Sequence, residues 1–311
     1  MRPGCHRNVE NFLLPAGVTV VNRLLEGMDM KNLLMTLVGV GVAAVNIPVL
    51  GVISITGPGT ATYSQNFDSL PNSGTTATWA NNSTLSGWYL YNSVGAAVTT
   101  IGVNNGASSA GSFYSYGSTS ERALGGLGSG GTYFGSPASG SVAGWIAVAF
   151  ANNSGLNIDA VTVGFDGEQW RNGGNTTPQT MVFEYGFGSS FASVTTWFAP
   201  GGAFDWTSPI ATGMAAAVDG NTMGFVGSRG GTIGSLTWAD GETLWLRWIE
   251  RNDAGNDHGL AIDNFSFSAN LVPIPEVETY VAAALAGVFG AFWLNRAIWG
   301  RRRNSPPDAA S

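Results

Sequence analysis

Residues 62–270 are predicted to fold as an all-β sandwich. Strand-like runs recur roughly every ten to fifteen residues and are separated by turns rich in Gly, Asn and Ser. Two of these runs alternate apolar and polar residues with a period of two, and no stretch of the region keeps a helical period. Short alternating strands at this spacing are typical of two packed antiparallel sheets. No repeat of fixed length is present, which disfavours a solenoid or a propeller.

The predicted strands take up most of this region. They are Ala61–Phe67, Gly87–Tyr91, Ser112–Tyr116, Gly144–Phe150, Ala160–Trp170, Thr180–Phe187, Val194–Phe198, Met223–Gly227, Leu236–Trp238, Thr243–Glu250 and Gly259–Phe267. In one alternating run, one face is predicted to hold Val161, Val163 and Phe165 and the other Thr162, Gly164 and Asp166. In the second run, one face is predicted to hold Leu244, Leu246 and Trp248 and the other Trp245, Arg247 and Ile249. We expect Ser118–Ser141 to form a long loop or irregular strands and Met214–Val218 to form a turn at most.

The composition of the region excludes some classes of function. It holds five arginines, no lysine and fourteen acidic residues, a net charge of −9. Nucleic acid is therefore excluded as a partner, because its binding needs a basic surface. The region has no cysteine, so its core must come from apolar packing, and about 209 residues suffice for one domain. Its large apolar residues include Trp79, Trp88, Trp145, Trp170, Trp197, Trp206, Trp238, Trp245 and Trp248.

Three segments follow the predicted sandwich. Residues 271–279 hold a Pro/Glu motif, residues 280–299 are apolar, and residues 300–311 form a basic end. The apolar segment is predicted to be a transmembrane helix, since Tyr280–Leu294 rises about 22 Å and the next residues extend it toward the thickness of a bilayer, about 30 Å. The arginines should stay in the cytoplasm, which leaves the sandwich outside. An amphipathic helix packed on the protein's own core and a permanent anchor without a sorting role are the alternatives.

The order of these segments resembles the PEP-CTERM sorting tail of Gram-negative bacteria. The residues that carry the match are Pro273, Pro275, Glu276, Thr279, Arg301, Arg302 and Arg303. Val277 stands where the usual motif has a second Pro. The resemblance implies an exosortase, a membrane-embedded cysteine peptidase, as a partner. It also implies that the chain is anchored in the inner membrane in transit and then sorted to the cell surface or extracellular matrix.

The amino-terminal part resembles a signal peptide within residues 28–61. Lys31 precedes an apolar stretch from Leu33 to Ile55, with small residues suited to cleavage between Ala44 and Ala61. Residues 1–27 have no role ahead of such a segment, so the start is predicted to be over-extended. A genuine helix over Val18–Leu25 and an uncleaved signal anchor are the alternatives.

The two ends of the predicted sandwich resemble the jelly-roll folds of carbohydrate-binding modules and MAM-type adhesion domains. The residues that carry this are Gln65–Leu70 and Gly259–Ser266. The resemblance implies a jelly-roll-like sandwich whose first and last strands pair. It also implies a structural Ca²⁺ at Asp68 and Asp263, where those strands meet.

A second group of oxygen donors, with Asp253 and Asp257, lies in the turn before the last strand. Calcium takes six to eight oxygen ligands, and such a turn offers several. The plainer interpretation is an acidic turn in which Asp263 accepts hydrogen bonds from the backbone. Calcium is therefore a candidate cofactor, and no other cofactor is predicted.

The most polar stretch of the chain suggests a sugar site made by Glu168, Trp170, Arg171 and Asn172. A Trp face stacks on sugar rings, and the polar groups bind hydroxyls. The alternative is that Trp170 ends a strand in the core and Arg171 pairs with a carboxylate. Paired carboxylates at Asp166 and Glu168 suggest a polysaccharide hydrolase more weakly, and a triad that uses His258 lacks a nucleophile motif.

The predicted function is that of an exported structural or adhesive protein that is not an enzyme. It would contact the membrane, an exosortase and an extracellular polysaccharide. A carbohydrate-binding module with its site near Trp170 is the alternative, and a hydrolase is the third choice.

Overall fold

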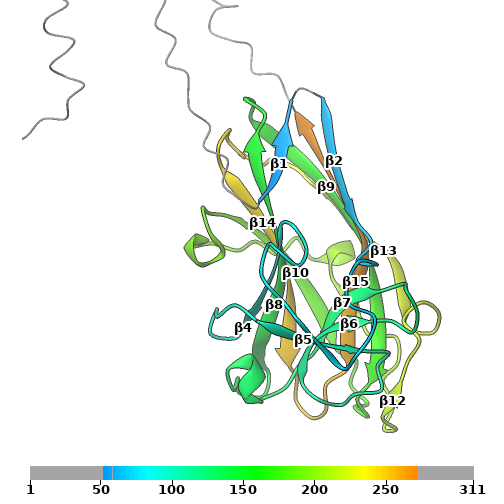
Figure 1. Cartoon of the computed structure of the whole chain (residues 1–311). Coiled ribbons are helices and arrows are strands. Elements are labelled where there is room, and N and C mark those ends of the chain that lie inside the picture. The colour runs from blue at the N-terminus through cyan, green and yellow to red at the C-terminus, as the bar shows by residue number, and fades with distance from the viewer. Residues whose placement is uncertain (1–51, 58, 272–311) are drawn as a thin grey trace, which may run out of the picture. The chain divides into compact units, whose positions relative to one another are not determined.

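The fold was analysed in a computed structural model, which describes residues 52–57 and 59–271. These residues form two β-sheets (Figure 1). The first sheet contains β1 (Ile53–Thr56), β4 (Trp88–Asn92), β8 (Ser141–Asn153), β10 (Thr180–Phe187), β11 (Trp206–Thr207) and β14 (Thr243–Asn252). The second contains β2 (Thr60–Gln65), β3 (Thr76–Thr78), β5 (Thr100–Asn104), β6 (Ser112–Tyr116), β7 (Ala123–Leu127), β9 (Ile158–Asn172), β12 (Ala216–Ala217), β13 (Phe225–Ile233) and β15 (Gly259–Leu271). Short 3₁₀ turns lie at Thr132–Phe134, Phe191–Ser193 and Gly202–Phe204.

Aromatic rings join the two sheets face to face. Phe150 of β8 stacks on Phe267 of β15 with the ring centroids 3.9 Å apart. Trp248 of β14 lies edge-on to Phe165 of β9 at 5.3 Å and to Phe265 of β15 at 5.7 Å. All five side chains belong to one buried cluster. The predicted all-β sandwich is thus confirmed at the level of two packed sheets. The predicted alternation is confirmed as well, and the faces that the structure turns to the core are those of Val161, Val163, Phe165, Leu244, Leu246 and Trp248.

The first and last predicted strands pair, as the jelly-roll resemblance implies. β15 runs antiparallel to β2, with Phe265 opposite Gln65 and Ala269 opposite Ala61. On its other edge β15 pairs with β9, and a register shift lies between Asp263 and Ser266. Asn264, inside that shift, has a φ of 48°. The bulge therefore changes which residues of β15 face the core, from Ile262 before it to Phe265 after it.

Two predicted strands are wrong. Residues 194–198 and 236–238 form no strand; each makes one isolated bridge, at Phe198 to Tyr185 and at Trp238 to Ile158. The region 118–141, expected to form a long loop or irregular strands, contains β7, and residues 214–218, expected to form a turn at most, contain β12. Gly125 explains why β7 carries so weak a strand signal: a Cβ there would lie 2.3 Å from the carbonyl oxygen of Leu260. Close approach of β15 therefore requires glycine at this point.

β1 lies within the predicted signal peptide. It pairs in parallel with β8, and the side chain of Ile55 is only 2% exposed. Residues 1–51 and 272–311 lie outside the described residues, and with them the rest of the signal peptide, the Pro/Glu motif, the transmembrane segment and the arginine cluster. Within residues 52–57 and 59–271, no helix has the length and hydropathy needed to cross a membrane.

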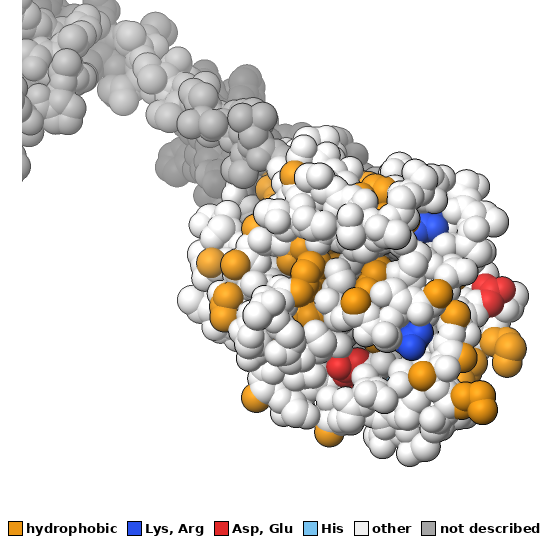
Figure 2. Space-filling view, turned by 60° about the horizontal axis from the view of Figure 1, so that its bottom comes forward, with side chains coloured by type: hydrophobic (Ala, Val, Ile, Leu, Met, Phe, Trp, Pro, Cys, Tyr) orange, Lys and Arg blue, Asp and Glu red, His pale blue; other side chains and the backbone are white. Residues whose placement is uncertain are grey.

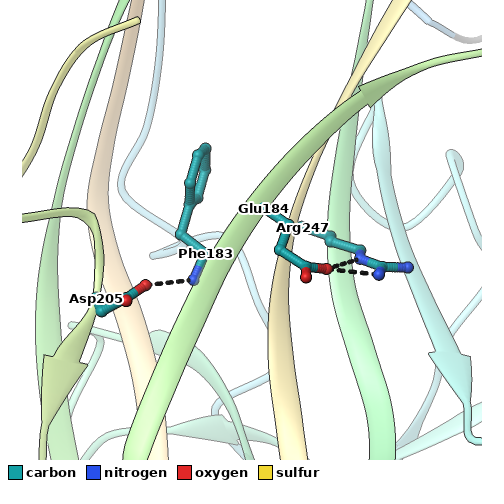
Figure 3. A network of polar contacts seen from close by, with 4 residues as sticks. All are labelled: Phe183, Glu184, Asp205 and Arg247. Atoms are coloured by element: carbon teal, nitrogen blue, oxygen red, sulfur yellow. Dashed lines mark hydrogen bonds and ion pairs between the residues drawn. The ribbon is translucent and has the colours of Figure 1, made fainter. Parts of the chain in front are cut away.

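The outer face of the first sheet is covered by the segment between β10 and β11. Figure 3 shows Arg247 of β14 paired with Glu184 on the neighbouring strand β10, at 2.5 Å between Nη2 and Oε2. The Arg247 guanidinium also lies 3.7 Å from the ring centroid of Trp197, which belongs to the covering segment. Asp205, near the end of that segment, accepts a hydrogen bond from the backbone N–H of Phe183 (Figure 3). These contacts leave the Arg247 and Glu184 side chains only 12% and 18% exposed on this face.

Candidate functional site

The outer face of β9 is buried where the sequence predicts a sugar site. Glu168, Trp170 and Asn172 point outward from the second sheet, yet each is at most 2% exposed. They are covered because a second apolar cluster sits on this face. Its members are Tyr114, Tyr116, Ala123, Leu127, Trp170 and Ala261.

Trp170 is a core residue of that cluster. Its ring is parallel to that of Tyr116, with centroids 6.1 Å apart, and Gly220 packs against the indole so closely that a Cβ there would lie 2.5 Å from it. Its Nε1–H donates to Oε2 of Glu168 at 2.9 Å. The ring therefore offers no open face for a sugar, which corrects the stacking role expected from the sequence.

Arg171 and Asn172 hold loops in place. Arg171 Nη1 donates to the carbonyl oxygens of Gly106 and Ala107, where the sequence suggests a carboxylate partner. Asn172 Nδ2 donates to Thr212 and to the carbonyl oxygen of Met214. Both contacts tie β9 to segments that are distant in sequence.

Three carboxylates meet beside Trp170, and we call Glu121, Glu168 and Asp263 the acidic centre. One oxygen from each lies within 4.8 Å of the others. Glu168 is 1% exposed and Asp263 is 3% exposed, while Glu121 is half-buried. The oxygens Glu121 Oε1, Glu168 Oε1 and Asp263 Oδ1 are buried without a hydrogen-bond partner in the described part of the chain. The centre joins β9, β15 and the loop before β7.

Burial and crowding raise the pKa values of two of these groups. Burial, partly offset by the Trp170 hydrogen bond, raises the pKa of Glu168 to about 7, and the neighbouring Glu121, Asp166 and Asp219 add to the rise. Burial, with the charges of Glu168 and Glu121 adding to it, raises the pKa of Asp263 to about 8. Away from water such an assembly of like charges is unfavourable unless protons or a cation neutralise it.

No arginine within residues 52–57 and 59–271 supplies that neutralisation by a direct ion pair. The only ion pair in this part of the chain joins Arg247 to Glu184. Arg122 follows Glu121 in sequence, but its guanidinium donates to Ser115 and to the carbonyl oxygen of Gly117. The acidic centre thus differs from an ordinary buried salt bridge.

The acidic residues predicted to bind calcium lie in separate places. Asp263 belongs to the acidic centre. Asp68 is exposed, and its Oδ1 accepts a hydrogen bond from the backbone N–H of Arg122. Asp257 accepts a hydrogen bond from the backbone N–H of Asp253 within the β14–β15 loop. Sequence reasoning missed Glu121, which stands in a loop without a motif, and assigned Glu168 to a sugar instead.

A polar cleft of about 400 Å³ lies between loops near the β14–β15 turn. Arg171 and Asp257 line it, with Asn252, Asn256, Ser109 and Ser129. Asn175 Nδ2 holds one wall by donating to the carbonyl oxygens of Ala254 and Asn256. Burial raises the pKa of Asp257 to about 7. The cleft is therefore a polar recess in which hydrogen bonds hold one wall in place. Arg171, which lines it, also belongs to the predicted sugar site.

The groups considered for hydrolysis are engaged in structural contacts. Asp166 accepts from the backbone N–H of Ser228 and from Asn264 Nδ2. His258 is 1% exposed, and its Nδ1 accepts from the backbone N–H of Gly173. Burial lowers the pKa of His258.

Comparison with known proteins gives no family. No family model matches the chain, and no curated protein matches it. The arabinose-bound α-L-arabinofuranosidase MgGH51 aligns at 11% identity and a TM-score of 0.35, over 70% of this chain and 29% of that one. The module TmCBM61 in complex with β-1,4-galactotriose aligns at 10% identity and a TM-score of 0.23, over 58% of this chain and 86% of that one. At these TM-scores the two likenesses carry no inference about what this chain binds.

Proposed function

We propose that this chain is an exported, non-enzymatic surface or matrix protein, in which a jelly-roll-like sandwich is displayed by a PEP-CTERM-like tail and acts structurally or adhesively. The observation that carries the proposal is the order of segments at the carboxyl end. β15 ends at Leu271, directly before the Pro/Glu motif of residues 272–279. The motif, the apolar run and the arginines therefore follow the last strand without an intervening domain.

The surface chemistry is consistent with this role. Figure 2 views the sandwich after a turn that brings the lower end of Figure 1 forward, and it shows few charged side chains on this face among backbone, uncharged and hydrophobic atoms. The whole chain is 11% charged, and the region of the sandwich has no lysine. Surfaces rich in Ser, Thr and Asn contact neutral polymers through hydrogen bonds, without needing charge complementarity.

Localisation in a Gram-negative host that has an exosortase tests the proposal. The full-length chain, with an epitope inserted at the exposed residue Met214, should reach the surface or matrix fraction. Replacing Arg301, Arg302 and Arg303 together by glutamate should block correct membrane orientation, since positive charge keeps the tail in the cytoplasm. Recovery of both chains in the same soluble cytoplasmic fraction would contradict export.

A carbohydrate-binding module is the second candidate, and the polar cleft favours it over a site on Trp170. Arg171, Asp257 and Asn256 line the cleft. Their side chains place hydrogen-bond donors and acceptors around a concave site rather than on a flat surface. The ligand expected there is a neutral or uronic oligosaccharide bound mainly by hydrogen bonds.

A glycan array with the full-length chain separates the two candidates. Saturable binding that Asp257→Asn reduces at least tenfold, with the melting temperature unchanged, would favour the module. The matched control is Asp159→Asn, an exposed acid at the start of β9 that does not line the cleft. Absence of saturable binding across neutral and acidic glycans would leave the structural role as the better proposal.

A further inference from the structure

We propose that Glu121, Glu168 and Asp263 bind one divalent cation, Ca²⁺, which fastens the loop before β7 to strands β9 and β15. This assignment is independent of the export and adhesion proposed above. It also places the metal at a different set of residues from the one that the sequence suggests, with only Asp263 in common.

The first argument is geometric. Calcium–oxygen distances are about 2.3–2.6 Å, so two ligands of one ion can be up to about 5 Å apart. One oxygen from each residue of the acidic centre already falls within 4.8 Å of the others. An ion can therefore touch all three carboxylates without rearrangement of the strands that carry them.

The second argument concerns unsatisfied atoms. Buried polar groups in folded proteins nearly always have a partner, and an orphaned charge is costly. Here Glu168 and Asp263 are nine-tenths buried or more, and Glu168 Oε1 and Asp263 Oδ1 have no hydrogen-bond partner among the described residues. Glu121 Oε1 is in the same state. Each of the three clustered carboxylates thus has one partnerless oxygen, and a cation bound among them would satisfy these atoms.

The other oxygens of the centre are held in place by neighbours. Trp170 Nε1–H donates to Glu168 Oε2 at 2.9 Å, and Asn221 Nδ2 donates to Glu121 Oε2 at 2.5 Å. Such contacts orient a ligating carboxylate and leave its second oxygen for the metal. They also explain why Trp170 and Glu168 are adjacent on one face of β9: the indole positions the carboxylate.

The donor set selects the kind of ion. All three ligands are hard carboxylate oxygens, and no histidine or cysteine belongs to the centre. Zinc prefers nitrogen and sulfur, whereas calcium prefers oxygen and accepts irregular geometry. With Glu168 Oε2 and Glu121 Oε2 held by Trp170 and Asn221, the three carboxylates supply three or four oxygens. Waters would complete the calcium shell of six to eight oxygens.

Binding to the full-length chain in detergent tests the assignment. We expect one Ca²⁺ per chain by calorimetry and a melting temperature several degrees higher in 5 mM CaCl₂ than in EDTA. Tb³⁺, which takes the same oxygen donors, should show luminescence on tryptophan excitation, because Trp170 contacts the ligand Glu168. Excess Ca²⁺ should quench that luminescence.

Variants distinguish Ca²⁺ binding at the acidic centre from Ca²⁺ binding in the β14–β15 loop. Glu168→Gln, Asp263→Asn and Glu121→Gln should each weaken Ca²⁺ at least tenfold and abolish the thermal shift. In EDTA they should melt no lower than the wild-type chain, because each removes a repelled carboxylate, so loss of binding will not reflect loss of fold. Asp257→Asn, in the β14–β15 loop, is the matched control and should bind normally.

Two results would overturn the proposal. One is a wild-type chain that melts identically in EDTA and in CaCl₂ and sensitises no Tb³⁺, which would mean that the carboxylates are neutralised by protons alone. The other is Ca²⁺ binding that Asp257→Asn abolishes and Asp263→Asn spares. Should one variant fail to fold, the other two and the wild-type stoichiometry still decide.

Discussion

At the scale of single residues, Trp170 is the clearest case of a side chain whose role depends on what covers it. It is 1% exposed and lies between Tyr116 and Gly220. Truncating a buried aromatic side chain costs about 3–5 kcal/mol, because the cavity is only partly refilled. Trp170→Ala should therefore lower the free energy of unfolding by about that amount, measured in urea. Met214→Ala, at a residue that is 78% exposed, should change it by under about 0.5 kcal/mol.

That experiment separates a packing role from a ligand role. If Trp170→Ala unfolds at the same urea concentration as the wild type and loses binding to a glycan, the ring would be a contact residue after all. If stability falls and Trp170→Phe restores most of it, the ring is packing, and the hydrogen bond to Glu168 is the smaller part of its contribution.

Glu250 gives a pH dependence of stability. Its side chain is 4% exposed, and its Oε2 has no hydrogen-bond partner in the described part of the chain. The carboxyl group fits because residue 126 is glycine: a Cβ there would lie 2.8 Å from Glu250 Oε2. Burial raises the pKa of Glu250 well above its ordinary value, and Asp257 and Asp253 raise it further. The folded state thus holds a proton that the unfolded state releases near pH 4.5, so this group's contribution to stability falls as the pH rises above that value.

Glu250→Gln removes that ionisation and should be stabilising at neutral pH. We expect its melting temperature to exceed that of the wild type by a few degrees at pH 8, since about 1 kcal/mol corresponds to about 2–4 °C for a domain of this size. The gain should shrink toward pH 4. Asp159→Asn, at an exposed residue, should show no such trend, and a gain for Glu250→Gln that is independent of pH would contradict the linkage.

At the scale of secondary structure, β1 determines how much of the amino-terminal region the sandwich needs. It pairs with β8 from Ile53 to Thr56, and Ile55 is buried in the core. Burying such a side chain contributes about 1.5–3 kcal/mol. A chain that starts at residue 52 should therefore be more stable in urea than one that starts at residue 59, by about 2–3 kcal/mol. Equal stability would show that β1 is dispensable and that cleavage before residue 59 leaves the fold intact.

Strands whose own residues favour extended structure could be predicted from the sequence. Strands whose conformation depends on their pairing partners could not. β6 and β10 match the predicted ranges because their own residues favour extended structure. β3, β5 and β7 were missed because Thr76–Thr78 is short and because glycine weakens the strand signal of Thr100–Asn104 and Ala123–Leu127. Their pairing partners therefore decide their conformation. The acidic centre was missed for a related reason. Glu121 and Asp263 are far apart in sequence, and only the pairing of β15 with β9 brings Asp263 to Glu168.

At the scale of the whole molecule, the sandwich is held by three apolar layers. The main cluster lies between the sheets, a cluster with Phe191 and Trp245 lies on the outer face of the first sheet, and the cluster around Trp170 lies on the outer face of the second. The acidic centre sits beside the Trp170 cluster, because the indole of Trp170 donates a hydrogen bond to Glu168. A cation there would fasten loop and strands at a place where the main core does not reach.

The boundary after Leu271 also separates the part of the chain that folds from the part proposed to direct sorting. β15 ends at Leu271, and the proposed sorting tail begins at the next residue. Deleting residues 272–311 should leave the melting temperature within about 1–2 °C of the full-length value, because surface changes away from the core cost little. The shortened chain should be released into the periplasm or medium instead of being held in the membrane or matrix fraction. Fractionation and melting of the two chains side by side test both halves of this prediction. A shortened chain that is retained like the full-length protein would remove the tail from the delivery mechanism, and one that melts far lower would make residues 272–311 part of the fold.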